Sequence, residues 1–91
     1  MLEIDIWPEA KEFLGSLPAK HRRQIASKLF SLAEKPFPAR SKQLEGFPPF
    51  RRLRSGTYRI VYFVEGNILN VPLINARNDD KIYRRLKKIF Q

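Results

Sequence analysis

Cysteine is absent from this 91-residue sequence, and histidine occurs once, as His21. The lack of cysteine excludes a disulfide framework and any thiolate metal site, and one histidine cannot build a site of several histidines. We expect no metal site of these kinds, and we expect no cofactor. Because disulfides are rare in reducing compartments, their absence also points to the cytoplasm.

Long apolar runs are missing as well. No segment approaches the roughly 20 apolar residues that a helix needs to span a bilayer. Residues 1–6 alternate apolar and acidic side chains, without the basic start and apolar run of a signal peptide. These features predict a cytoplasmic protein that has no membrane partner.

Acidic residues are scarce: nine Asp and Glu stand against 18 Lys and Arg, for a net charge of +9. Residues 1–48 carry eight basic and six acidic side chains (+2), whereas residues 49–91 carry ten and three (+7). Such a concentration favours a phosphate backbone or an acidic protein as partner. The alternative is a cationic surface that serves solubility alone.

Apolar residues make up 43% of the chain and include eleven aromatics, enough for one compact core. Together with the length, this predicts a single domain over residues 1–91. Apolar residues recur with a period of two in some segments and at helical spacing in others, which predicts the order β-α-α-β-β-β-α. We expect strands at 2–7, 50–54, 57–64 and 67–76, and helices at 9–17, 18–35 and 80–90.

This order predicts an α+β fold, with a mostly antiparallel four-stranded sheet, a helical hairpin on one face and a C-terminal helix. Ile25, Leu29, Leu32 and Ala33 are the expected inner stripe of the second helix. Residues 36–49 contain four prolines and predict a connection without regular structure. Pro72 is unexpected within a strand, because proline donates no ladder hydrogen bond and prefers edges or bulges.

Arginines crowd the first hairpin of the predicted sheet. In a strand, Arg52 and Arg54 share one face while Leu53 points the other way, and Arg59 follows across a tight turn. Because arginine matches phosphate oxygens with two parallel donors, the cluster indicates an anionic ligand. The alternative for any one of these arginines is a solvated sheet face.

A second segment, 75–83, places Arg77 at the end of the last strand and Tyr83 one turn into the last helix. Functional groups are common where a strand ends in a loop. A tyrosine there can stack on a nucleobase or donate its hydroxyl. The alternative for Tyr83 is a core aromatic.

These two segments resemble the RelE/ParE toxin superfamily. The resemblance rests on LRSGTYRIVYFV, which begins at Leu53, and on INARNDDKIYRRL at 74–86. Its most specific features are the tyrosine-arginine-hydrophobe-hydrophobe-tyrosine strand and the six-residue separation of Arg77 and Tyr83. The expected element order is also that of the superfamily, and the resemblance covers nearly the whole chain.

The resemblance implies the toxin of a type II toxin–antitoxin pair. RelE-like members are metal-independent, ribosome-dependent endoribonucleases, in which the RNA 2′-hydroxyl attacks the neighbouring phosphate. Arg59 would bind phosphate and stabilise the transition state, Arg77 would lie near the leaving 5′-oxygen, and Tyr83 would stack on or orient the base. The implied catalytic residues are Arg52, Arg59, Arg77 and Tyr83, and the expected substrate-binding residues are Arg51, Arg54 and Lys81.

One departure from RelE affects the chemistry, because Arg52 stands where RelE has a catalytic lysine and Phe50 where it has another. A general base works best with a pKa near the working pH. Arginine stays protonated at every pH up to about 12, so it cannot readily accept a proton. Arg52 can stabilise charge on the phosphate but is a poor base. Either charge stabilisation is sufficient, another group accepts the proton, or the chain does not cut. His21, expected on the outer part of the second helix, is not expected to act.

Two further functions stay open: a ParE-like inhibitor of DNA gyrase, and a degenerate member that binds RNA or its partner without cutting. In each case the resemblance implies a cognate acidic antitoxin that covers or displaces the active elements of the toxin, with the last helix as the element to be displaced. The expected partners are that antitoxin, the ribosome and mRNA, and operator DNA only through the antitoxin.

Overall fold

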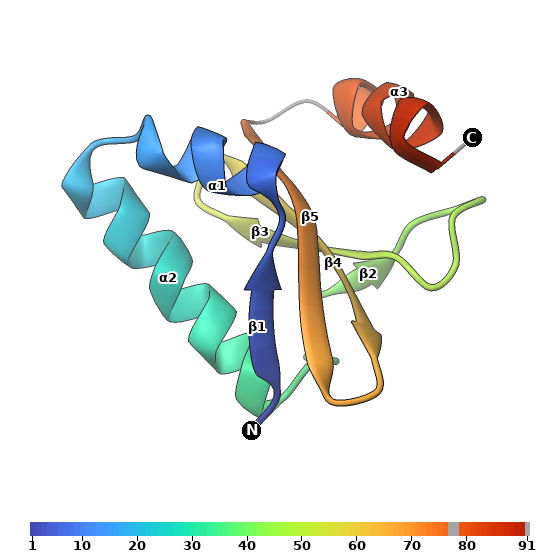
Figure 1. Ribbon diagram of the computed structural model, residues 1–91, viewed down its shortest axis with the longest axis horizontal. Coiled ribbons are helices and arrows are strands. Elements are labelled where there is room, and N and C mark those ends of the chain that lie inside the picture. The colour runs from blue at the N-terminus through green and yellow to red at the C-terminus, as the bar shows by residue number, and fades with distance from the viewer. Residues whose placement is uncertain (77–78, 91) are drawn as a thin grey trace.

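The computed structural model describes residues 1–76 and 79–90. Its elements are β1 (Glu3–Ile6), α1 (Pro8–Gly15), α2 (Ala19–Glu34), β2 (Lys42–Gln43), β3 (Arg51–Ser55), β4 (Tyr58–Glu65), β5 (Ile68–Ala76) and α3 (Asp79–Phe90). The expected α+β class is confirmed, and so is the order of the seven expected elements. In Figure 1, α1 and α2 form a hairpin beside the sheet, and α3 lies apart from them near the end of β5.

The strands form one sheet in the order β1-β5-β4-β3-β2. All neighbours pair antiparallel except β1 and β5, which are parallel, so the expected mostly antiparallel sheet is confirmed. The sheet has five strands rather than the expected four, because Lys42–Gln43 pairs with the start of β3. A strand of two residues in a proline-rich segment is too short to show a period.

Pro72 lies opposite an irregularity between β4 and β5. The pairing changes from Val61↔Leu73 to Phe63↔Asn70, so that two residues of β5 lie opposite Tyr62 alone. A bulge leaves one residue out of the ladder, which accommodates a proline that has no N–H to donate. A central strand therefore tolerates Pro72.

Each face of the sheet is covered by helices. On one face the hairpin packs against the sheet, and the four residues expected on the inner stripe of α2 are all buried there. On the other face a smaller core forms beneath α3, with Ile82 and Leu86 fully buried. The buried members of this second core are Leu44, Phe50, Val61, Leu73, Ile82 and Leu86. Since side chains alternate along each strand, the residues that flank these members point toward the hairpin.

Candidate functional site

Three strands bring polar side chains into one row at the end of the sheet where β5 leads toward α3. Arg59 on β4 pairs with Arg54 on β3 and with Asn75 on β5. By the alternation of strand side chains, these residues share the face that α3 covers. The next row on that face contains Arg52, which pairs with the buried Val61.

Two arginines in direct cross-strand register are unfavourable for a sheet by themselves, because like charges repel at this spacing. Arg59 is half-buried, and its Nη1 donates to the carbonyl of Thr57 at 3.1 Å. Arg54 is exposed and Arg52 is half-buried on the same face. A phosphate bound across this pair would replace the repulsion with two charge-assisted contacts.

Arg51 lies on the opposite face from Arg52 and makes structural contacts. Its Nε donates to Ser41 Oγ at 3.0 Å, and its Nη2 donates to the Ser41 carbonyl at 3.1 Å. Its Cζ lies 5.3 Å from the centre of the Phe37 ring, a cation–π distance. The structure therefore brings Arg52, Arg54 and Arg59 together but does not bring Arg51 to them.

Tyr83 lies at the border of the core beneath α3. Its ring is half-buried and packs against Phe47, with the ring centres 5.7 Å apart. The fully buried Ile82 and Leu86 hold this helix on the sheet. Tyr83 therefore has a packing role, and it also keeps part of its side chain accessible.

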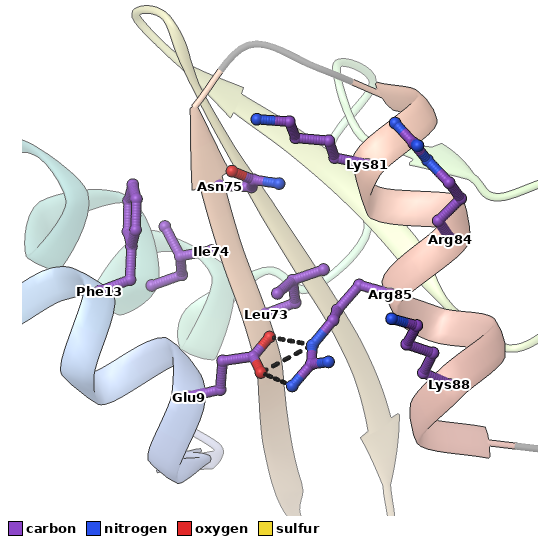
Figure 2. Close-up of a pocket in the computed structure, with 9 residues that line it drawn as sticks. All are labelled: Glu9, Phe13, Leu73, Ile74, Asn75, Lys81, Arg84, Arg85 and Lys88. Carbon is purple, nitrogen blue, oxygen red and sulfur yellow. Dashed lines mark hydrogen bonds and ion pairs between the residues drawn. The ribbon is translucent and has the colours of Figure 1, made fainter.

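A cleft of about 430 Å³ lies between α1, β5 and α3. Figure 2 shows the residues that line it. Lys81 extends from α3 toward β5, where Asn75 also lines the cleft. Arg85 binds the carboxylate of Glu9 through two nitrogens, with Nε at 2.7 and 2.9 Å from its two oxygens. This hydrogen-bonded ion pair links α3 to α1, and it raises the pKa of Arg85.

His21 is half-buried, not turned outward as expected from the helical pattern. Its Nδ1 shares a hydrogen bond of 2.6 Å with the hydroxyl of Tyr58. Tyr58 precedes Arg59, so its side chain points to the hairpin side of the sheet. The structure thus separates the one histidine from the arginine face.

The remaining predicted catalytic residue, Arg77, lies outside the residues that the structure describes. In the described part of the chain, no group of three or more His, Cys, Asp or Glu residues could hold a metal ion. Within the same residues, no helix combines the length and the apolar content needed to cross a membrane.

Two neighbours of this site were not identified from the sequence. Asn75 becomes a candidate only through its register with Arg59, and Phe47 only through its contact with Tyr83. Both contacts join segments that are distant in the chain, so no local pattern reveals them.

No family model and no curated protein matches the chain. Solved structures do match it. A double mutant of the Escherichia coli toxin RelE in the free state has a TM-score of 0.80 at 24% identity, covering 99% of this chain and 98% of that one. The toxin–antitoxin complex RelBE of E. coli gives 0.73 at 26% identity, over 86% of this chain and 99% of the other.

The archaeal RelE–RelB complex of Pyrococcus horikoshii gives a TM-score of 0.74 at 25% identity, over 85% of this chain and 96% of the other. These matches confirm the resemblance to RelE that the two sequence segments carried. The chain has the fold of the RelE toxins, over almost the full length of the solved chains.

Proposed function

We propose that this RelE-like chain is the toxin of a type II toxin–antitoxin pair and that it cuts mRNA as a metal-independent, ribosome-dependent endoribonuclease. The observation that carries the proposal is the gathering of Arg52, Arg54 and Arg59 on one sheet face, beside the helix that bears Tyr83. The same face is where the resemblance places the catalytic residues. The fold shared with RelE toxins supports the proposal from an independent direction.

The proposed reaction needs positioning and charge more than it needs a cofactor. The 2′-oxygen attacks the adjacent phosphorus and loses its proton, the bond to the 5′-oxygen breaks, and that oxygen takes up a proton. The products are a 2′,3′-cyclic phosphate and a 5′-hydroxyl. Guanidinium groups fixed on the strands can stabilise the negative charge that builds on the phosphate oxygens.

Each predicted site residue except Arg51 has a proposed role. Arg59 and Arg52 would contact the phosphate, and Arg54 and Lys81 would contact the flanking backbone. Arg77 would act at the leaving oxygen, and Tyr83 would hold the base. We leave Arg51 out of the substrate contacts, because Ser41 and Phe37 already fix its side chain.

We also propose a cognate acidic antitoxin as partner, with operator DNA contacted only through it. The neighbouring solved structures include RelE with RelB and YoeB with YefM. The net charge of +9 suits an acidic partner and would speed its encounter. The helix α3 would be the displaced element, because its removal uncovers the apolar core around Val61 and Leu73 together with the arginine face.

Inhibition of gyrase is the second candidate, favoured by Arg52 and Phe50 at the positions where RelE has lysines. The two functions differ in their effects on cells. A gyrase inhibitor breaks DNA and induces the SOS response, whereas a ribosome-dependent nuclease arrests translation and leaves cleaved transcripts.

Transcript mapping after brief induction of the chain without its partner tests the proposal. We expect new 5′ ends within translated codons, and we expect Arg59→Ala and Arg77→Ala to abolish them. Arg22→Ala is the matched control, because Arg22 is exposed on α2, across the sheet from the site. Intact transcripts together with DNA damage would instead indicate inhibition of gyrase. Unchanged cleavage by Arg59→Ala would show that the arginine face takes no part in the reaction.

A further inference from the structure

A cationic cleft lies at the edge of the sheet, beside the arginine face. It has a volume of about 450 Å³ and is lined by Lys28, Arg40, Lys42, Arg52, Arg54 and Gly56. Arg52 and Arg54 belong to the candidate site, whereas Lys28 comes from α2 and Lys42 from β2. The cleft therefore joins the arginine face to elements that have no part in the proposed chemistry.

A second cleft, of about 540 Å³, continues along α2. It is lined by Lys20, Arg23, Gln24, Ser27, Lys28, Ser55 and Gly56. The α2 members recur at helical spacing and form one stripe, which runs roughly 12 Å at about 1.5 Å per residue. Lys28 and Gly56 line both clefts, so the two adjoin at these residues.

The open edge of β3 allows the two clefts to adjoin. The short strand β2 pairs only with Arg51 and Arg52, so among the described residues no strand lies along the outer side of Leu53–Ser55. Gly56 follows at the turn with φ of 61°, a conformation that favours glycine. A β-carbon placed at Gly56 would meet nothing within 4 Å, so the turn stands open between the two clefts.

We infer that these two clefts form one groove for an RNA backbone, here called the edge groove, which takes the strand onward from the arginine face and over α2. This inference rests on the proposed function and extends its substrate site. The contacts assigned to the edge groove are those of Lys28, Arg40, Lys42, Lys20 and Arg23 with phosphates outside the scissile one.

The composition of the groove selects this ligand over an acidic protein. The lining of these two clefts consists of cations, uncharged polar side chains and a glycine. A third cleft adjoins them at Lys28 and Arg40, and the acidic Glu34 is in its lining, outside the groove. Neither of the two clefts has an apolar side chain in its lining, so neither offers the apolar pocket in which an aromatic anchor of a protein partner is commonly buried. A phosphate backbone needs only spaced cations.

The test measures RNA affinity by fluorescence anisotropy, for single-stranded RNAs of about 4 and about 16 nucleotides, across a salt series. The groove variant is Lys28→Glu with Lys42→Glu, two exposed residues outside the proposed catalytic set. We expect the unaltered chain to bind the longer RNA more tightly. The groove variant should lose much of this preference for the longer RNA, because two of the five assigned cations are reversed. The slope of log affinity against log salt for the longer RNA should fall in magnitude by about 1.4, at about 0.7 for each of two phosphates that the variant no longer neutralises.

The matched control is Lys11→Glu with Lys87→Glu, which lie exposed on α1 and α3 and change the net charge from +9 to +5, as the groove variant does. Equal reductions in affinity in both variants would show a general charge effect and overturn the groove. A longer RNA that binds the unaltered chain no more tightly than the short one would also overturn it. Thermal unfolding of each variant, with Lys28→Gln and Lys42→Gln as a milder pair, identifies any loss of fold.

Transcript mapping separates this inference from the proposed function. Cleaved transcripts together with equal affinities for long and short RNA would overturn the edge groove alone. Length-dependent binding that depends on Lys28 and Lys42, together with intact transcripts, would retain the groove and refute the nuclease.

Discussion

Arg52 is the residue at which the proposed chemistry departs most from that of RelE, because a guanidinium replaces an amine that can release its proton. If charge is its contribution, Arg52→Lys should keep most of the cleavage activity and Arg52→Gln should reduce it by about 100-fold, the usual effect of removing one stabilising donor. Single-turnover cleavage of ribosome-bound mRNA measures both. A Lys variant that is faster at high pH than at low pH would instead show that a base is limiting at this position.

A substitution of His21 tests whether this residue accepts the proton in the proposed reaction. Its ring is held by the Tyr58 hydroxyl on the hairpin side of the sheet, away from Arg52. We expect His21→Gln to leave the cleavage rate and its pH dependence unchanged, within about twofold, because the ring cannot reach the reacting oxygen. A changed pH profile in this variant would make His21 the group that accepts the proton.

Tyr62 belongs to the strand motif that carried the resemblance, yet its contacts are structural. The side chain is fully buried, and its hydroxyl donates to the carbonyl of Pro36 at 2.6 Å. Tyr62→Phe should lower the free energy of unfolding by about 0.5–1.5 kcal/mol, because the half-buried carbonyl of Pro36 loses its donor. Urea denaturation measures this change, while transcript cleavage should persist; a variant as stable as the parent would show that the carbonyl finds another donor.

At the residue scale, the sequence predicted which arginines share one face of the sheet. Arg52, Arg54 and Arg59 are close in the chain, and the period of a strand places them on one face. The same period puts Arg51 on the other face, and the structure shows what holds it there. Asn75 and Lys28 were not found, because strand register and the packing of α2 bring them to the site from distant segments.

Among the elements, α3 depends on its apolar contacts more than on its ion pair. A helix of 12 residues is marginal alone in water, so Ile82 and Leu86 must hold it on the sheet. Leu86→Ala should cost about 2–5 kcal/mol of local stability. Arg85→Ala should cost less, because the ion pair with Glu9 is exposed.

Hydrogen exchange resolves these two effects at the level of single amides. In Leu86→Ala the amides of α3 should exchange faster while those of β4 and β5 stay protected, since the hairpin core on the other face is untouched. If Arg85→Ala opens α3 as much as Leu86→Ala does, the link to α1 is the main support of the helix.

Long helices and strands were easier to predict from the sequence than short ones. Helix α2 and the strands of the meander repeat an apolar pattern several times, and their positions were predicted to within a few residues. β2 has two residues and repeats nothing. The parallel pairing of β1 with β5 depends on how the chain returns across the sheet, which no local pattern encodes.

At the scale of the whole molecule, the charge of +9 acts on stability as well as on binding. Like charges within one compact domain repel, and salt screens exposed charges over about 10 Å at 0.1 M. Raising NaCl from about 0.02 to about 0.5 M should therefore raise the midpoint of thermal unfolding. For a domain of this size, each kcal/mol of added stability corresponds to about 4–8 °C.

The two double variants test whether charge repulsion causes the expected rise of the unfolding midpoint with salt. Both lower the net charge to +5, one at Lys28 and Lys42 and the other at Lys11 and Lys87, so salt should raise the midpoint of both by less than it raises that of the parent. A smaller rise in the groove variant alone would assign the effect to the crowded cations beside Arg52 and Arg54, which is where a bound RNA would relieve the same repulsion. A midpoint that falls with salt would contradict the argument, because ion pairs such as that of Arg85 with Glu9 would then contribute more than the repulsion costs.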